Sequence, residues 1–223
     1  MNTTKKKSNT TALVIAAVVV AVVAALVVAL VAGGSSDDES SPNSSAPSSA
    51  APGAAAENQP VEVVGSALVP LENEAADPAV GQPAPTLRGA TFDGSPLEIA
   101  PGGGTDQLIV FLAHWCPHCN AELPIIEEWR AAGMIPDGLD VVAVSTAVSS
   151  DRPNYPPSKW LDDKGWTWPA LADSADMTAA AAYGVTGYPF MVIVGPDGDV
   201  KGRTSGQKEL AALDAWVTST LGR

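Results

Sequence analysis

Two largely apolar runs flank a segment of helical periodicity in the second half of the chain. The runs, at residues 107–113 (QLIVFLA) and 139–145 (LDVVAVS), are typical of strands that are buried on both faces of a sheet. Between them, residues 116–132 place Leu123, Ile126 and Trp129 near one face of a helix that ends at Gly133. This order predicts two parallel strands joined by a helical crossover.

The rest of this region alternates helices with further strands. A hairpin is expected around Asp93-Gly94, and the turn at 196–198 (PDG) makes the last two strands antiparallel. Short helices are expected at 158–164 and 174–183, the second capped by Ser174, and a closing helix at 208–221. We therefore predict one α/β domain over residues 81–223, with a mixed sheet between two layers of helices (α/β/α).

Residues 12–32 are an unbroken stretch of Ala, Val, Leu and Ile. A helix of this length spans roughly 31 Å, close to the hydrocarbon core of a membrane at about 30 Å. Lysines precede the stretch and acids follow it, so the positive-inside rule places residues 1–11 in the cytoplasm and the domain outside. A cleaved signal peptide is the alternative, but its apolar region is usually shorter. We predict a single-pass, uncleaved signal-anchor in the cell membrane.

The composition changes between this anchor and the domain. Residues 33–60 consist mostly of Ser, Ala, Pro and Gly, which predicts a disordered linker, and residues 61–80 are expected to form an extended lead-in. The chain carries a net charge of −13, with 25 acidic and 12 basic side chains. A surface this acidic disfavours nucleic acid as a partner.

The chain has two cysteines, Cys116 and Cys119, at the junction of the first apolar strand and the helix. A thiol at a helix N-terminus lies near unpaired N–H groups and the positive end of the helix dipole, which favour the thiolate. Pro117 suits the first helical position. The i, i+3 spacing puts both sulfurs on one side of the first turn. These features predict a redox pair in which Cys116 attacks and Cys119 resolves; zinc binding and an inert disulfide are the alternatives.

Other side chains near the pair have several interpretations. His118 is expected to tune the thiolate by hydrogen bonding or charge. Glu122, one turn after Cys119, is either a proton acceptor for the resolving thiol or a first-turn acid favoured by the helix dipole. Pro189, after Tyr188, is either a cis-proline in a tight turn or an ordinary strand-entry proline. His114 is expected at the surface, at the end of the strand.

At these motifs the chain resembles the thioredoxin superfamily, and within it the membrane-anchored TlpA/ResA-like branch. The matching segments are 81–85 (GQPAP), 92–94 (FDG), 115–119 (WCPHC), 122–124 (ELP) and 184–189 (GVTGYP). The resemblance implies a thioredoxin-like fold and a cis-Pro189 beside the cysteines, where Trp115 and Tyr188 help to position substrate. It also implies that Glu122 is an active-site glutamate and that Pro124 kinks the helix.

The chain departs from the family pattern at two positions. Val110 stands where thioredoxins proper carry a buried aspartate, so a proton relay has to use Glu122 or water. The Pro117-His118 dipeptide matches DsbA-type oxidases, whereas the anchored branch is mostly reductive, so both directions of electron flow stay open. A peroxiredoxin-type peroxidase is disfavoured because its P-x-x-x-[ST]-x-x-C pattern is absent. A redox-silent partner-binding module is disfavoured by the intact cysteine pair.

The function we predict is an extracytoplasmic protein disulfide oxidoreductase that exchanges dithiol and disulfide at Cys116 and Cys119. Its expected partners are exported cysteine-containing proteins or apocytochromes, together with an integral-membrane redox partner. No bound cofactor or resident metal is expected, because the cysteine pair carries the electrons. The alternative is a copper-binding, metallochaperone-like protein of the same fold, with the two cysteines and a histidine as soft ligands.

Overall fold

The computed structural model describes residues 56–223. The predicted cytoplasmic segment 1–11, the predicted anchor 12–32 and residues 33–55 of the predicted linker lie outside the described residues. Within residues 56–223, no helix has the length and apolar character needed to cross a membrane.

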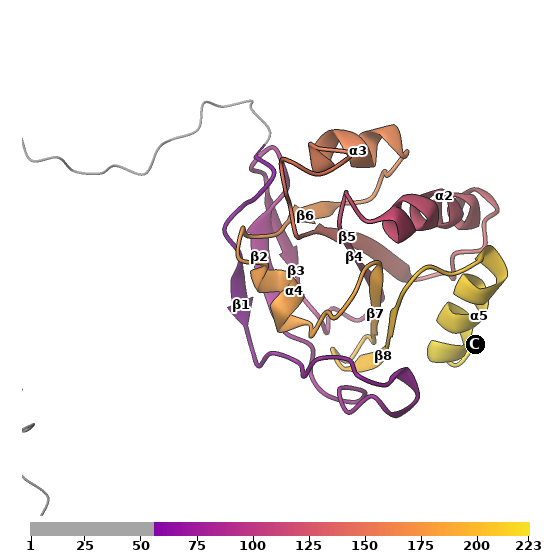
Figure 1. Cartoon of the computed structure of the whole chain (residues 1–223). Coiled ribbons are helices and arrows are strands. Elements are labelled where there is room, and N and C mark those ends of the chain that lie inside the picture. Colours follow the sequence, from indigo (N-terminus) through magenta and orange to yellow (C-terminus); the bar gives the residue numbers. More distant parts are fainter. Residues whose placement is uncertain (1–55) are drawn as a thin grey trace, which may run out of the picture. The chain divides into compact units, whose positions relative to one another are not determined.

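The centre of the domain is a mixed five-stranded sheet with the spatial order β6-β5-β4-β7-β8 (Figure 1). Its strands are β4 (Asp106–Leu112), β5 (Leu139–Ser145), β6 (Ala170–Ala172), β7 (Phe190–Val194) and β8 (Val200–Ser205). β4 pairs in parallel with β5 and antiparallel with β7, and β8 runs antiparallel to β7. The structure therefore confirms the predicted parallel pair, the final antiparallel pair and the mixed sheet.

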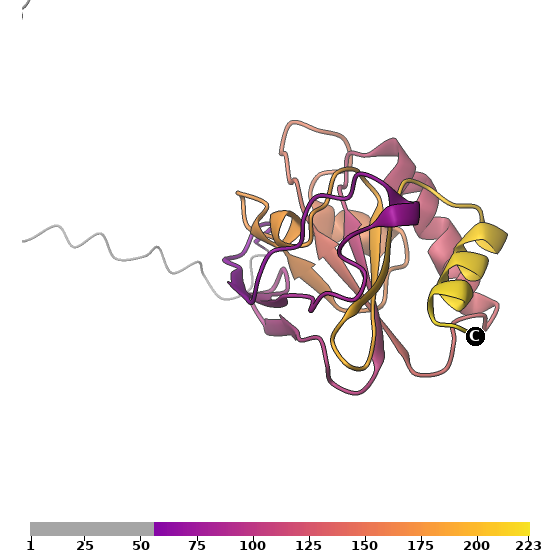
Figure 2. The same ribbon diagram turned by 90° about the horizontal axis from the view of Figure 1, so that it is seen from below.

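Central strand β4 is buried on both faces, which explains its continuous apolar sequence. Leu108, Val110 and Leu112 face one hydrophobic cluster, and Ile109 and Phe111 face the other; all five are fully buried. The first cluster also contains apolar side chains from α2 (Pro117–Ala131), α3 (Pro157–Asp163) and α5 (Leu210–Thr220). These helices cover one face of the sheet, where α2 and α5 lie side by side (Figures 1 and 2).

The opposite layer differs from the predicted layer of helices. It contains the short helix α4 (Thr178–Ala182) and a second, antiparallel sheet with the order β1-β2-β3. The strands of this sheet are β1 (Glu62–Val64), β2 (Thr86–Ala90) and β3 (Pro96–Ile99). The predicted hairpin around Asp93-Gly94 is present, and it packs on the main sheet as part of a separate small sheet.

Helix α4 begins four residues later than predicted. Met177, just before it, has a φ of 58°, in the left-handed region that a continuing helix excludes. Ser174 still accepts a hydrogen bond through Oγ from the N–H of Thr178, at 3.0 Å. The buried carboxylate of Asp173 accepts from the N–H groups of Ala179 and Ala180 at 2.8 and 3.2 Å, and so satisfies the start of the helix.

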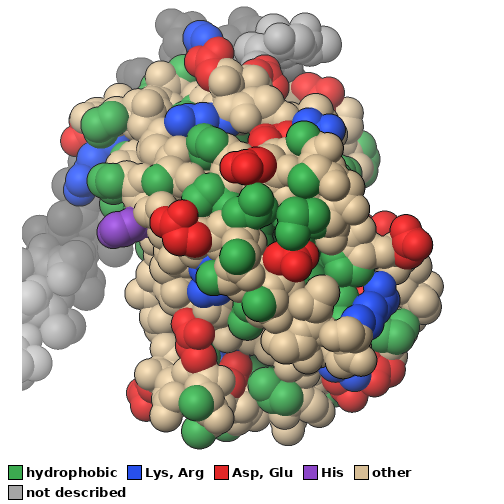
Figure 3. Space-filling view, turned by 90° about the vertical axis from the view of Figure 1, so that its right-hand side faces the viewer, with side chains coloured by type: hydrophobic (Ala, Val, Ile, Leu, Met, Phe, Trp, Pro, Cys, Tyr) green, Lys and Arg blue, Asp and Glu red, His purple; other side chains and the backbone are tan. Residues whose placement is uncertain are grey.

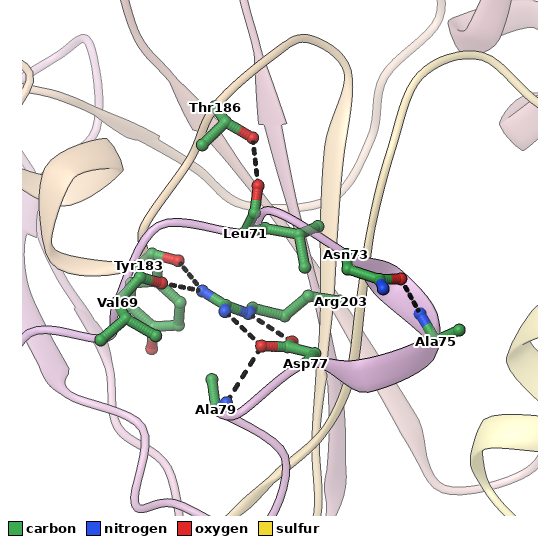
Figure 4. Close-up of polar contacts among 9 residues, drawn as sticks. All are labelled: Val69, Leu71, Asn73, Ala75, Asp77, Ala79, Tyr183, Thr186 and Arg203. Carbon is green, nitrogen blue, oxygen red and sulfur yellow. Dashed lines mark hydrogen bonds and ion pairs between the residues drawn. The ribbon is translucent and has the colours of Figure 1, made fainter.

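The lead-in segment 61–80 is part of the folded domain. It contributes β1, the 3-10 turn η1 (Glu74–Ala76) and buried apolar side chains such as Leu68 and Leu71. Arg203 of β8 holds this segment through a buried ion pair with Asp77, with N–O distances of 2.6 and 2.8 Å (Figure 4). The same guanidinium donates through Nη1 to the carbonyl oxygens of Val69 and Tyr183, each at 2.9 Å.

Acidic and basic side chains are scattered among apolar ones on the face of the molecule that carries α5 (Figure 3). The basic side chains on this face do not merge into one large area. This arrangement lacks the continuous basic surface that attracts a nucleic acid backbone.

Candidate active site

The two cysteines lie where β4 ends and α2 begins. Cys116 is the residue just before the helix, with an extended backbone (φ −75°, ψ 123°), and Pro117 is the first helical residue. The N–H of Cys116 donates to the carbonyl oxygen of Ala113 at 3.0 Å, which closes the turn between strand and helix. This is the strand-end, helix-start position that the sequence predicts for the pair.

Both cysteines are free thiols, and their environments differ. Cys116 retains a small exposed area of 7%, whereas Cys119 is fully buried. Burial raises the pKa of the Cys119 thiol well above its ordinary value, and the nearby charges of Cys116 and Glu122 act in the same direction. An incoming group therefore reaches Cys116 first, while Cys119 stays protonated until a base accepts its proton.

A loop from the other side of the site faces Cys116. The peptide bond between Tyr188 and Pro189 is cis, as the resemblance implies. The thiol of Cys116 donates to the carbonyl oxygen of Tyr188, with an S–O distance of 3.4 Å. The rings of Trp115 and Tyr188 meet edge to face, with centroids 6.2 Å apart, and so form an aromatic rim beside the thiol.

The lead-in segment supports this loop from behind. Leu71 receives a hydrogen bond at its carbonyl oxygen from Thr186 Oγ1, at 3.1 Å (Figure 4). Its N–H donates to the carbonyl oxygen of Gly184, also at 3.1 Å. The network around Arg203 fixes the same segment. The position of the cis-proline loop therefore depends on residues that precede the predicted start of the domain.

Glu122 is a fully buried carboxylate one turn beyond Cys119. Its Oε2 accepts a hydrogen bond of 2.6 Å from the backbone N–H of Lys208, and its Oε1 has no partner within the described residues. Burial raises the pKa of Glu122 to about 7, against the opposing effects of the Lys208 N–H and ammonium. A carboxylate with this pKa accepts and releases a proton near neutral pH.

His118 lies on the surface, where its Nδ1 is 3.4 Å from Oε1 of Gln207. Together with Gly206 and Glu209 these residues line a hollow of about 340 Å³. Val110, which the resemblance aligns with the buried aspartate of thioredoxins proper, is buried in the cluster that contains Cys119. Pro124 lies inside α2, which continues past it to Ala131.

The prediction that His114 lies at the surface is wrong, because the side chain is fully buried. Its Nε2 accepts from the N–H of Ser149 at 3.2 Å, so Nδ1 carries the proton and donates to the carbonyl oxygen of Pro153 at 2.7 Å. Its own carbonyl oxygen accepts from the side-chain amides of Asn120 and Asn154. These contacts bind a loop, residues 147–156, to the turn that carries the cysteines; no sequence signal predicts them.

Metal coordination is the alternative role for these residues. Across residues 56–223, His, Cys, Asp and Glu do not form any group of three or more that could hold a metal ion.

Most of the described domain matches a known protein family. Residues 79–215 match the Redoxin family model. The chain belongs to the Redoxin family. Among related proteins, the thioredoxin-like protein YneN of Bacillus subtilis (strain 168) is 29% identical to this Redoxin chain over 133 residues, which cover 58% of the chain and 75% of YneN.

A soluble secreted antigen of Mycobacterium tuberculosis is 36% identical to the chain over 87 residues. This alignment covers 36% of the chain and 47% of the antigen, so the chain spans about half the length of that relative.

Solved structures show the same fold. A thiol:disulfide interchange protein of the thioredoxin family from Chlorobium tepidum TLS is 26% identical, with a TM-score of 0.51, over 66% of this chain and 100% of that one. A second Chlorobium tepidum structure, of an interchange protein of the DsbE kind, is 23% identical with a TM-score of 0.52, over 64% and 98% of the chains. The Redoxin domain thus has a thioredoxin-like fold, and its relatives support a redox enzyme.

Proposed function

We propose that this Redoxin-family chain is an extracytoplasmic thiol–disulfide oxidoreductase that acts on exported proteins. The observation that carries the proposal is the asymmetric pair at the start of α2, in which Cys116 keeps a small exposed area beside the cis-proline loop and Cys119 is fully buried. This arrangement suits an attacking and a resolving thiol.

In the reductive direction, the Cys116 thiolate attacks one sulfur of a substrate disulfide. A Cys116–substrate disulfide forms, and the other substrate sulfur leaves as a thiolate. Cys119 then loses its proton and attacks Cys116 Sγ, which releases the second substrate thiol and leaves a Cys116–Cys119 disulfide. The reverse sequence transfers the disulfide to a substrate dithiol. No bound cofactor is required in either direction.

Glu122 is proposed as the proton acceptor for Cys119. Burial disfavours the thiolate form of Cys119, and the carboxylate of Glu122 has a pKa of about 7. One of its oxygens has no partner among residues 56–223, so that oxygen has room for the transferred proton. In the same proposal His118 tunes the thiolate of Cys116, and Trp115, Tyr188 and Pro189 position the substrate backbone beside it.

The cellular setting extends this proposal. The apolar stretch 12–32 anchors the chain in the cell membrane, with the N-terminus in the cytoplasm and the domain outside. Exported cysteine-containing proteins or apocytochromes are the substrates, and an integral-membrane protein exchanges electrons with the pair. Nucleic acid is not a partner, in keeping with the net charge of −13.

The first test is the equilibrium reduction potential of the full chain in glutathione buffers, with Cys116→Ser as the control. A potential near −120 mV identifies an oxidant, and one near −270 mV or below identifies a reductant that needs electrons from the membrane; both values are about those of known relatives of this fold. The absence of any reversible two-electron couple overturns the proposal, and titration with copper then tests the alternative.

A further inference from the structure

One arginine stands apart from the others in the described domain. Within residues 56–223, Arg88, Arg130, Arg203 and Arg223 each form an ion pair with a carboxylate. Arg152 forms none, and its side chain is exposed. Instead, its guanidinium carbon lies 5.0 Å from the centroid of the Trp115 ring, next in the chain to Cys116.

The nearest acid in sequence does not neutralise this arginine. The carboxylate of Asp151 accepts a hydrogen bond from Ser149 Oγ, which is the main cause of its lowered pKa. The charge of Arg152 adds to this effect without a contact within ion-pair distance. The guanidinium therefore keeps its N–H donors available for another group while it lies over the indole ring. Stacking on an aromatic ring also orders the side chain before a partner arrives.

The loop that carries Arg152 is fixed to the cysteine turn. Trp115 donates through Nε1 to the carbonyl oxygen of Ala147 at 2.7 Å, and His114 binds the same loop through both ring nitrogens. Asn154 adds a hydrogen bond of 2.9 Å to the carbonyl oxygen of His114. Arg152 is thus held at a defined place beside the Trp115–Tyr188 rim of the site.

We propose that Arg152 is a specificity-determining residue, which favours substrate segments that carry a carboxylate close to their reacting cysteine. The inference rests on the proposed exchange at Cys116. An extended segment advances about 3.3 Å per residue, so a substrate segment that runs from Cys116 across Trp115 brings an Asp or Glu one to three residues from its cysteine to the guanidinium. The planar N–H groups of arginine match a carboxylate in two parallel hydrogen bonds.

The experiment isolates the first chemical step in the full chain with Cys119→Ser. The probes are three peptides that differ only at the residue after their single cysteine, which is Asp, Asn or Lys, and whose cysteine carries a 2-thiopyridyl disulfide. Attack of the Cys116 thiolate on the peptide sulfur forms a Cys116–peptide disulfide and releases 2-thiopyridone, whose absorbance gives the second-order rate constant.

We expect the Asp peptide to react about two to five times faster than the Asn peptide, and the Lys peptide to react more slowly, as is typical of an exposed charge pair. Arg152→Gln should make the three rates similar, and Arg152→Glu should invert the order. At 1 M salt, where the Debye length is about 3 Å, the wild-type preference should shrink.

Arg130→Gln is the matched control, because Arg130 also lies over a tryptophan, 5.6 Å from the centroid of Trp168, but in the last turn of α2, at the opposite end of the helix from the cysteines. This variant should keep the wild-type order of rates. An unchanged Asp-over-Lys preference in Arg152→Gln overturns the inference alone. A failure of all three peptides to react with Cys116 overturns the proposed function and the inference with it.

Discussion

The buried carboxylate of Glu122 accepts a hydrogen bond of 2.6 Å from the backbone N–H of Lys208, a residue of the segment that leads into α5. This bond joins α2, one turn beyond Cys119, to a segment 86 residues later in the chain. It satisfies only Oε2 of the carboxylate, since Oε1 has no partner among residues 56–223. The incomplete compensation explains why burial dominates and raises the pKa of this group.

The pKa of Glu122 predicts a measurable pH dependence of stability. The folded-state pKa is about 7, above the ordinary value of 4.5. Between these values the folded chain binds an extra proton, so the free energy of unfolding contributed by this group falls as pH rises from about 4.5 to about 7. One group contributes a slope of at most about 1.4 kcal/mol per pH unit.

Glu122→Gln should lack this decrease, and urea unfolding at several pH values measures it. Glu128→Gln, at an exposed position of the same helix, should keep the wild-type pH dependence. Identical pH profiles for wild type and Glu122→Gln would contradict the assignment of a raised pKa to this carboxylate.

The two histidines should differ sharply in their contribution to stability. His114→Phe removes the partners of the Ser149 N–H and the Pro153 carbonyl oxygen in a partly buried place, at a cost of about 1–3 kcal/mol in the free energy of unfolding. His118→Phe, at an exposed position, should change it by less than about 0.5 kcal/mol. Chemical denaturation of both variants makes the comparison, and equal stabilities would exclude the structural role given to His114.

The parts of the fold that the sequence predicts well are those encoded by neighbouring residues. The β4–α2–β5 unit and the position of Cys116 follow from apolar runs, a helical period and Pro117, all within one continuous stretch. The burial of His114 has no such local signal, because its partners are 35 and 39 residues away. Hydrophobicity patterns carry no information on such polar contacts between distant segments.

The same reason explains the lead-in segment. Its many acids and prolines are typical of an extended approach to a domain, yet Asp77 is buried because Arg203, 126 residues later, neutralises it. An ion pair between residues this far apart in the sequence can be recognised only once the fold has brought β8 and the lead-in segment 61–80 together. The position of Arg152 over Trp115 without an ion-pair partner has no sequence signature either, because it depends on the conformation of the loop.

Breaking the ion pair between Asp77 and Arg203 should be costly. Arg203→Met leaves a buried carboxylate without its partner, which typically lowers the free energy of unfolding by about 3–5 kcal/mol. The double replacement Asp77→Leu with Arg203→Met should cost less than Arg203→Met alone, because no uncompensated charge remains. Lys159→Met, which breaks an exposed pair with Asp163, serves as the control and should have little effect. Equal losses in the Arg203 and Lys159 variants would refute this prediction.

Two glycines with the same backbone conformation provide a test of the contact behind the cis-proline loop. Gly133 and Gly184 have φ values of 67° and 66°. A Cβ on Gly133 meets no atom within 4 Å, whereas a Cβ on Gly184 overlaps the carbonyl oxygen of Val69. Both alanine variants carry the cost of the left-handed region, about 1–2 kcal/mol, and Gly184→Ala should lose about 1–3 kcal/mol more. Thermal or urea unfolding would detect this difference, and similar losses would argue against a tight contact at Val69.

The first described residues fix how a mechanical load enters the domain. The N–H of Ala56 donates to the carbonyl oxygen of Phe92, the carboxylate of Glu57 accepts from the N–H and Oγ of Ser158, and Asn58 donates to the carbonyl oxygen of Asp173. A pull on the chain from its N-terminal side is therefore borne by the β2–β3 turn and the start of α3. The lead-in that supports the cis-proline loop lies beyond these attachments, whereas the start of α3 follows directly on the loop that His114 and Trp115 hold, so tension at that end reaches the Cys116 turn through α3 rather than through the lead-in.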